Sequence, residues 1–301
     1  MHLNKMDCHA LTRRGQGRSE NEDQYLIADL VKAVQIQSTS LSYDAHANIT
    51  GQSHGKVLLV AEGRGGQAAG RRASTLAVDE TINSMVNRIL WSAFDHSAGR
   101  DDRQRLTADL VTTLKSCQNR IHDELQWNDD KQGMATTLTV AIVDWPALYV
   151  GHVGNSRCYL DRAGRFRQLT ASHGNVIGGE SADFSPQVYQ EELAIGDTLL
   201  LCTDALTKHV ADDEIAEIIH KRNSAKRTCE DLVAGADAAG SSDNITVAVA
   251  RFHDSAHSDL QTKADVELER DVAEQKPRAQ SPNEESLGAT AVAPPVSYLP
   301  R

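Results

Sequence analysis

The sequence predicts an α+β domain in which helices pack on antiparallel β-sheet. Short apolar or alternating segments follow one another with tight connections over Thr136–Val143, Ala147–Val153, Ser156–Leu160 and Phe166–Leu169. Parallel strands would need crossover connections of about a dozen residues or more, so these strands are expected to form an antiparallel meander. Two long segments, 68–90 and 102–126, instead carry apolar residues at helical spacing. Helices of this kind, alternating with antiparallel strands, give an α+β domain whose helices cover a sheet.

The individual elements follow from local patterns. Residues Arg162–Arg165 carry Ala-Gly between two strand-like segments, which predicts a hairpin turn. The helix over 102–126 is expected to bury the face formed by Leu106, Leu110, Leu114, Ile121 and Leu125. Further strands are predicted at Tyr25–Leu30, Val31–Gln37, Lys56–Ala61, Thr198–Cys202 and Asn244–Arg251. Two shorter helices are predicted at Asp212–Lys221 and Thr228–Ala239.

The composition changes near residue 252, which predicts the end of the folded domain. Five of the seven prolines lie beyond that point, at Pro277, Pro282, Pro294, Pro295 and Pro300, among Ala, Ser and Glu. A segment with so few large apolar residues cannot offset the entropy lost on ordering. We therefore expect one domain over residues 8–252 and an acidic, proline-rich, disordered tail over 253–301.

Charge and cysteine usage restrict the partners and the location. The formal net charge of −11 argues against binding to a nucleic-acid backbone or an anionic membrane. No apolar stretch approaches the length of a membrane span, and the N-terminus lacks the core of a signal peptide. The five cysteines are scattered singly, which is typical of reduced thiols and predicts a cytoplasmic protein.

Acidic residues stand at the ends of four predicted strands. Asp23 and Asp243 directly precede strands, whereas Glu62 and Asp204 follow buried ones. A buried carboxylate costs several kcal/mol unless it is paired or bound to a metal, and oxygen ligands favour hard cations. Each acid taken alone also fits an ordinary turn or cap. The glycines after Glu62 lack the Lys and hydroxyl of a phosphate-binding loop, so together the acids indicate a cation site.

Six motifs in order resemble the metal-dependent protein phosphatases of the PPM, or type 2C, family. They cover most of residues 12–251. The family's Arg-x-x-Asn-Glu-Asp, Asp-Gly-x-Gly-Gly and Gly-Thr-Thr elements are matched by RSENEDQY, VAEGRGGQAAGRRAS and GMATTLTVAIV. Its His-Val-Gly-Asp-Ser-Arg, Asp-Gly-Leu-Thr and Asp-Asn-Ile-Thr-Val elements are matched by GHVGNSRCYL, LLLCTDALT and SSDNITVAV. Each motif alone is weak, but six in the same order are specific.

The resemblance implies a four-layer sandwich of two antiparallel β-sheets flanked by helices, with two divalent cations, Mn²⁺ or Mg²⁺, at one end. It implies that Glu62, the Gly63 carbonyl, Asp204 and Asp243 bind the metals and that Asp23 supports them. Arg18 takes the place of the arginine that binds the substrate phosphate. The implied activity is hydrolysis of phosphoserine and phosphothreonine on proteins by a metal-activated water. The implied partners are phosphorylated proteins, a Ser/Thr kinase and the substrates of that kinase.

The sequence also departs from the family pattern. Glu62 and Asn155 stand where the family has Asp, and Ala205 stands where it has Gly. If position 205 needs a positive φ, Ala adds roughly 1–2 kcal/mol of strain. Arg64 occupies a variable position, and the segment from Thr170 to Thr198 is shorter than the family's flap. Because Mg²⁺ demands stricter geometry, the longer Glu62 side chain favours Mn²⁺. The alternative left open is a non-catalytic phosphatase-like protein that binds phosphoproteins or partner proteins.

Overall fold

The computed structural model describes residues 6–36, 48–88, 100–126, 133–179 and 184–253. These residues belong to one compact unit, Met1–Gln261. The predicted division into a domain over 8–252 and a tail over 253–301 stays a prediction, because residues 254–301 lie outside the described part of the chain.

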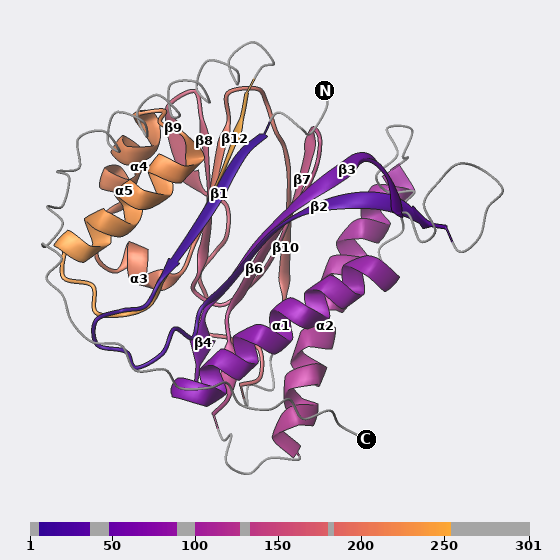
Figure 1. Ribbon diagram of the computed structural model, residues 1–301, viewed down its shortest axis with the longest axis horizontal. Coiled ribbons are helices and arrows are strands. Elements are labelled where there is room, and N and C mark those ends of the chain that lie inside the picture. The colour runs from indigo at the N-terminus through magenta and orange to yellow at the C-terminus, as the bar shows by residue number, and fades with distance from the viewer. Residues whose placement is uncertain (1–5, 37–47, 89–99, 127–132, 180–183, 254–301) are drawn as a thin grey trace, which may run out of the picture. The chain divides into compact units, whose positions relative to one another are not determined.

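Two five-stranded sheets form the centre of the fold (Figure 1). The first has the order β1 (Met6–Arg13), β12 (Ile245–Phe252), β11 (Thr198–Cys202), β8 (Arg157–Arg162), β9 (Arg165–Gln168). The second has the order β10 (Gln187–Glu192), β7 (Ala147–Val153), β6 (Leu138–Asp144), β3 (Asn48–Ala61), β2 (Gln24–Gln35). Neighbouring strands in both sheets pair antiparallel. A short third pair joins β4 (Gly63–Arg64) to β5 (Ala135–Thr136).

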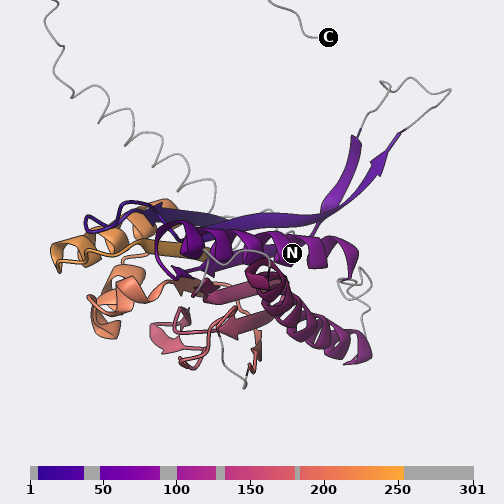
Figure 2. The same ribbon diagram turned by 90° about the horizontal axis from the view of Figure 1, so that it is seen from below.

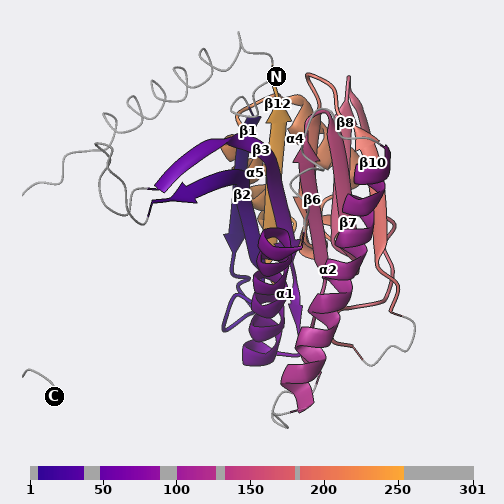
Figure 3. The ribbon, with the colours of Figure 1, turned by 90° about the vertical axis from the view of Figure 1, so that its right-hand side faces the viewer.

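The alternation of side chains along the strands builds four layers. In β3, Leu58 and Val60 pack into the core between the two sheets, whereas Val57 and Leu59 face helices α1 (Gln67–Asn87) and α2 (Arg100–Gln126). The other sheet buries its outer face under α4 (Asp212–His220) and α5 (Ala225–Ala238). Figure 3 shows α1 and α2 in front of their sheet. The predicted four-layer sandwich is confirmed.

The predicted meander is wrong in one respect. Strands β6 and β7 pair in one sheet and β8 and β9 pair in the other, so the chain changes sheets between Val153 and Arg157. Both sheets present apolar residues to the shared core, so local patterns do not distinguish the two. The predicted turn after Arg162 is confirmed, since Ala163 and Gly164 have φ values of 51° and 79° and connect paired strands.

Four elements were not predicted, and two predicted strands are one. Strands β1 and β10 lie at sheet edges and have weakly apolar sequences, β4 has only two residues, and α3 (Asp204–Thr207) is a single turn. Strand β2 runs continuously through Leu30 and Val31, with an irregular register at that point. Figure 2 shows β2 and β3 continuing as a pair beyond the rest of their sheet.

Candidate functional site

All six site residues predicted from the sequence line one cleft of about 470 Å³. The cleft lies where β3 ends, β2 and β12 begin, and β11 passes into α3. Its lining comprises Arg18, Glu22, Asp23, Glu62, Gly63, Arg64, Gly65, Gly66, Asn155, Asp204, Lys208, Asp243 and Asn244. Five segments far apart in sequence thus contribute to a single, strongly polar site.

The backbone of Glu62 is fixed between β3 and β4 by two neighbouring threonines. Its amide donates to Thr137 Oγ1 at 3.2 Å, and its carbonyl accepts from the Thr137 amide at 3.0 Å and from Thr136 Oγ1 at 2.9 Å. The side chain is only 15% exposed, and among the described residues its Oε2 has no hydrogen-bond partner. Burial, and next the nearby charge of Asp204, raise the pKa of Glu62. This oxygen is therefore available to a cation.

Close backbone packing explains the glycine at position 63. A Cβ atom at Gly63 would lie 2.3 Å from the Gly70 carbonyl oxygen and 2.6 Å from the Glu22 carbonyl oxygen, and neither can move freely. Gly65 and Gly66 have positive φ values of 112° and 81°, which turn the chain from β4 into α1. The glycine cluster packs α1 against the end of the β2–β3 pair, and so holds Glu62 at the cleft.

Asp23 links the two sheets beneath the cleft. Its Oδ2 accepts from Thr246 Oγ1 at 2.7 Å and from Thr203 Oγ1 at 3.2 Å, although Asp23 itself precedes a strand of the other sheet. Burial is the main cause that raises the pKa of Asp23 to about 7, and the charges of Glu62 and Asp243 act in the same direction. The carboxylate is thus fixed beneath the other acids of the cleft, and its support of a metal site stays a prediction.

Arg18 and Asp243 form an ion pair at the rim of the cleft. Arg18 Nε lies 2.8 Å from Asp243 Oδ1, and Nη2 donates to Oδ2 at 2.9 Å, so both carboxylate oxygens are engaged. Oδ1 also accepts from the Asn244 amide at 2.8 Å. The hydrogen bond to Asp243 raises the pKa of Arg18. The side chains of Arg18 and Asp243 are 44% and 36% exposed, so both can be reached from solvent.

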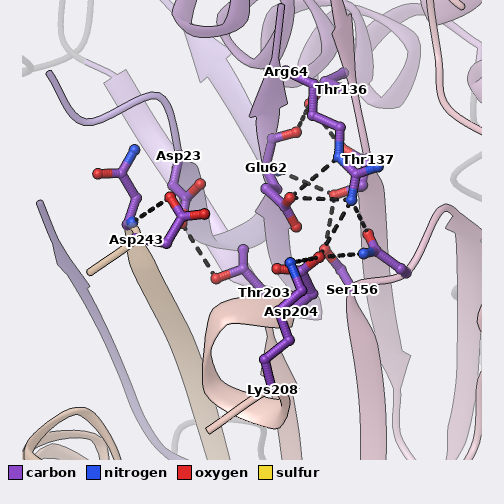
Figure 4. A network of polar contacts seen from close by, with 12 residues as sticks. Asp23, Glu62, Arg64, Thr136, Thr137, Ser156, Thr203, Asp204, Lys208 and Asp243 are labelled. Carbon is purple, nitrogen blue, oxygen red and sulfur yellow. Dashed lines mark hydrogen bonds and ion pairs between the residues drawn. The ribbon is translucent and has the colours of Figure 1, made fainter. Parts of the chain in front are cut away.

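Asp204 is surrounded by cationic and amide groups (Figure 4). Its Oδ2 lies 2.7 Å from Lys208 Nζ, accepts from Arg64 Nη2 at 3.3 Å, and accepts a close hydrogen bond from Asn155 Nδ2. Arg64 also donates from Nε to Glu62 Oε1 at 3.2 Å and from Nη2 to Asn155 Oδ1 at 2.6 Å. The contacts of Arg64, Lys208 and Asn155 were not predicted. The only signal for Lys208 was its position four residues after Asp204, one helical turn away.

The strain expected at Ala205 does not occur. Ala205 lies in the single turn α3, and among the described non-glycine residues only Ala163 and Arg222 have positive φ values. The condition for strain, a positive φ at position 205, is not met, because the chain enters a helix directly after β11, where an alanine is well tolerated. The shortened flap cannot be followed throughout, because residues 180–183 of that segment lie outside the described residues.

The donor set fits hard divalent cations, but the acids are engaged by other groups. Among the described residues, no three Asp, Glu, His or Cys side chains are grouped closely enough to hold a metal ion as they stand. Three of the acids are instead paired with cationic side chains: Arg64 contacts Glu62, Lys208 contacts Asp204, and Arg18 contacts Asp243. Even so, five acids line one cleft, and the buried Glu62 Oε2 has no partner among the described residues. Carboxylate and carbonyl oxygens of this kind suit Mg²⁺ and Mn²⁺.

A family profile, sequence relatives and solved structures all relate this chain to protein phosphatases. The profile of the family described as protein phosphatase 2C matches residues 33–247. The serine/threonine phosphatase stp of Listeria innocua is 29% identical over 216 residues, which cover 64% of this chain and 82% of the relative. The crystal structure of the Mycobacterium tuberculosis serine/threonine phosphatase PstP/Ppp superposes with a TM-score of 0.63 at 25% identity and covers 83% of this chain and 99% of the other.

A further solved structure is that of the catalytic domain of the serine/threonine protein phosphatase PstP in complex with two manganese ions. It superposes with a TM-score of 0.62 at 24% identity, and the match covers 83% of this chain and 99% of that domain. At this level of identity the likeness establishes the shared fold.

Proposed function

This chain belongs to the protein phosphatase 2C family, and on that premise we propose that it is a metal-dependent phosphatase that hydrolyses phosphoserine and phosphothreonine in proteins. The observation that carries the proposal is the cleft that gathers Arg18, Asp23, Glu62, Asp204 and Asp243. The alternative, a non-catalytic phosphatase-like protein, is not favoured, because the relatives are named as phosphatases.

The chain's own oxygens would hold two divalent cations, Mn²⁺ or Mg²⁺. We assign this role to the carboxylates of Glu62, Asp204 and Asp243 and to the carbonyl of Gly63, with Asp23 as the buried support. When bound, such cations supply Lewis acidity that activates a water molecule and stabilises the charge on the phosphoryl group. Glu62 contributes an oxygen fixed by its backbone hydrogen bonds to Thr136 and Thr137. Asp204, the first residue of α3, contributes a carboxylate oxygen.

Arg18 would bind and orient the phosphoryl group. Its planar guanidinium already engages both oxygens of Asp243, which is the same forked geometry that two phosphoryl oxygens require. Asp243 would use its carboxylate for a cation in place of Arg18. Arg18, which lies at the exposed rim, would then present its guanidinium to the phosphoryl group of a phosphorylated side chain.

The residues of the cleft also favour direct attack by water. None of the described residues that line it is Ser, Thr, Cys or His, the side chains that most often form covalent intermediates. Cys202 lies two residues before Asp204 of the cleft, but its side chain is buried, and burial raises the pKa of its thiol to about 12. A thiolate nucleophile is therefore not available at neutral pH.

The proposed substrates are phosphoproteins, and the proposed finer partners are a Ser/Thr kinase and its substrates. We also propose a cytoplasmic location, which the five cysteines support, since each is a free thiol. Separately, no helix among the described residues is long and apolar enough to cross a membrane.

A panel of phosphopeptides tests the proposed reaction. The protein with MnCl₂ in large excess should release phosphate from phosphoserine and phosphothreonine peptides and from p-nitrophenyl phosphate. Asp204→Asn should abolish release while the circular dichroism spectrum stays that of the wild type. A folded wild-type protein that binds the phosphopeptides but never releases phosphate would instead establish the non-catalytic alternative.

A further inference from the structure

Arg64 is shared by two acids of the cleft. It lies in β4, two residues after Glu62, and its guanidinium contacts Glu62 Oε1 at 3.2 Å and Asp204 Oδ2 at 3.3 Å. Figure 4 shows its side chain reaching toward Glu62, which follows β3, and toward Asp204, the first residue of α3. These two acids are 15% and 5% exposed at their side chains, so Arg64 provides a positive charge to groups that water reaches poorly.

Asn155 completes this link in a way that an Asp cannot. Its Oδ1 accepts from Arg64 Nη2 at 2.6 Å, while its Nδ2 donates to Asp204 Oδ2. A carboxylate at this position would accept from Arg64 but would place a negative charge beside Asp204 in place of a donor. Arg64 and Asn155 therefore form a matched pair that joins Glu62 to Asp204.

We propose that Arg64 is a built-in competitor of the divalent cations and sets the affinity of this site for them. This inference rests on the proposed function, in which Glu62 and Asp204 bind the cations. A divalent cation that enters at Glu62 Oε2 would meet the guanidinium on the other oxygen of the same carboxylate. The guanidinium occupies oxygens of the same two carboxylates and repels an incoming cation, so Arg64 must give up its contacts with Glu62 and Asp204 for a divalent cation to bind them. The site then loads only when divalent cations are abundant.

Two other positively charged side chains of the cleft, Lys208 and Arg18, can be compared with Arg64. Lys208 contacts Asp204 at 2.7 Å, but its side chain is 57% exposed, and among the described residues it forms an ion pair with no second acid. Arg18 pairs with Asp243 at the rim. Loss of Lys208 removes the same charge as loss of Arg64 and breaks one carboxylate contact in place of two. Direct competition therefore predicts a larger effect at position 64 than at position 208.

The competition also predicts a reciprocal effect on stability. Arg64 compensates Glu62 and Asp204 only while no divalent cation is bound, so its removal should destabilise the cation-free protein alone. A ligand that binds the folded state stabilises it by mass action, and a tighter site gains more from the same ligand. In EDTA the melting temperature of Arg64→Ala should fall below that of the wild type, and saturating Mn²⁺ should close the gap.

Isothermal titration of the full-length, EDTA-treated protein with MnCl₂ tests the proposal without reference to turnover. Arg64→Ala should bind Mn²⁺ about tenfold more tightly than the wild type and Lys208→Ala about threefold, since partly buried ion pairs contribute at this level. Arg71→Ala is the matched control, because Arg71 contacts Glu20 at 3.8 Å and does not line the cleft. Its affinity should equal that of the wild type. Arg64→Gln keeps a donor without the charge and should show the same tenfold gain, so it decides the question if Arg64→Ala does not fold.

The outcomes separate this inference from the proposed function. If the wild type binds Mn²⁺ and Arg64→Ala and Arg64→Gln bind it no more tightly, the competition is overturned and the metal site stands. If Lys208→Ala gains as much affinity as Arg64→Ala, general electrostatics accounts for the effect and the inference is wrong. If neither the wild type nor any variant binds Mn²⁺, the proposed metal site fails, and the competition fails with it.

Discussion

Arg18 holds both carboxylate oxygens of Asp243, with its Nε 2.8 Å from Oδ1 and its Nη2 2.9 Å from Oδ2. One residue comes from the loop between β1 and β2, and the other from the loop before β12, 225 positions later. The pair places a forked cation at the rim of a cleft whose other acids are less exposed. In the proposed reaction, Arg18 would make the same forked contact with the phosphoryl group of the substrate.

Arg18→Lys should raise KM for a phosphothreonine peptide roughly tenfold, because an ammonium ion cannot engage two oxygens in one plane. Stability should change by less than about 0.5 kcal/mol, since the Arg18–Asp243 pair is largely exposed. Steady-state kinetics measures the first effect and urea unfolding the second. Arg71→Lys, outside the cleft, is the control and should leave KM unchanged. An unaltered KM in Arg18→Lys would show that Arg18 does not bind the phosphoryl group.

Glu62→Asp should raise turnover with either cation, and the wild type should turn over faster with Mn²⁺ than with Mg²⁺. The side chain of Glu62 reaches one methylene farther from a fixed strand end than an Asp would, and Mg²⁺ tolerates displaced ligands less well than Mn²⁺. Parallel titrations of both proteins with each cation, on a single substrate, give the comparison. A wild type that is fully active with Mg²⁺, together with a slower Glu62→Asp, would mean that Glu62 is adapted to its site.

Gly63→Ala should destabilise the fold by roughly 1–3 kcal/mol, the usual range for overpacking. The added Cβ would lie 2.3 Å from the Gly70 carbonyl oxygen, and the backbone must move to relieve the contact. Gly174→Ala is a matched control, since a Cβ there meets no atom within 4 Å. Urea unfolding of both variants against the wild type checks the difference. Equal stability of the two variants would refute the packing explanation for this glycine.

His152 should make the protein less stable as the pH falls below 6.5. Its ring is fully buried, with Nε2 donating to the Gly154 carbonyl oxygen and Nδ1 accepting from Thr139 Oγ1. Burial, and then the neighbouring His173, lower the pKa of His152 to about 4. Between pH 6.5 and 4, His152 is therefore protonated in the unfolded chain and neutral in the folded chain. The free energy of unfolding consequently falls as the pH falls through this range.

The magnitude of the His152 effect can be isolated with a variant. Between pH 7 and pH 5.5 it should reduce the free energy of unfolding by about 1 kcal/mol. His152→Gln keeps a donor for the Gly154 carbonyl but does not titrate, so its stability should fall by about that much less over the same interval. Urea unfolding at both pH values measures this difference. If the free energy of unfolding falls equally in both proteins between pH 7 and pH 5.5, His152 is excluded as the cause.

The sequence predicted those parts of the fold that depend on local patterns. Strand β11 was predicted with its observed bounds, because Thr198–Cys202 is a continuous apolar segment between turns. The assignment of β8 to the opposite sheet from β7 was missed, since Leu148 and Leu160 face the same core from different sheets. Edge strand β10 was missed because a strand paired on one side needs few apolar residues.

The site was predicted in its acids and missed in its cations. Glu62 and Asp204 could be predicted because a carboxylate at the end of a buried strand is energetically costly unless it is paired or bound to a metal. Arg64 and Lys208 gave no such signal, because a charged residue in a loop or at a helix end is ordinarily solvated. Only the fold shows that both contact Asp204. The contacts between segments, such as Asn155 with Asp204, were likewise beyond the reach of local patterns.

The central claim is that the acids of this cleft support metal-dependent phosphate release, and one measurement tests it most directly. EDTA-treated wild type and Asp243→Asn are titrated side by side with MnCl₂ while phosphate release from a phosphothreonine peptide is followed. We predict that the wild type is inactive without the cation and gains activity that saturates with Mn²⁺. We predict that Asp243→Asn remains folded and inactive throughout. Activity of the wild type in EDTA, or equal activity of the two proteins at saturating Mn²⁺, would contradict the claim.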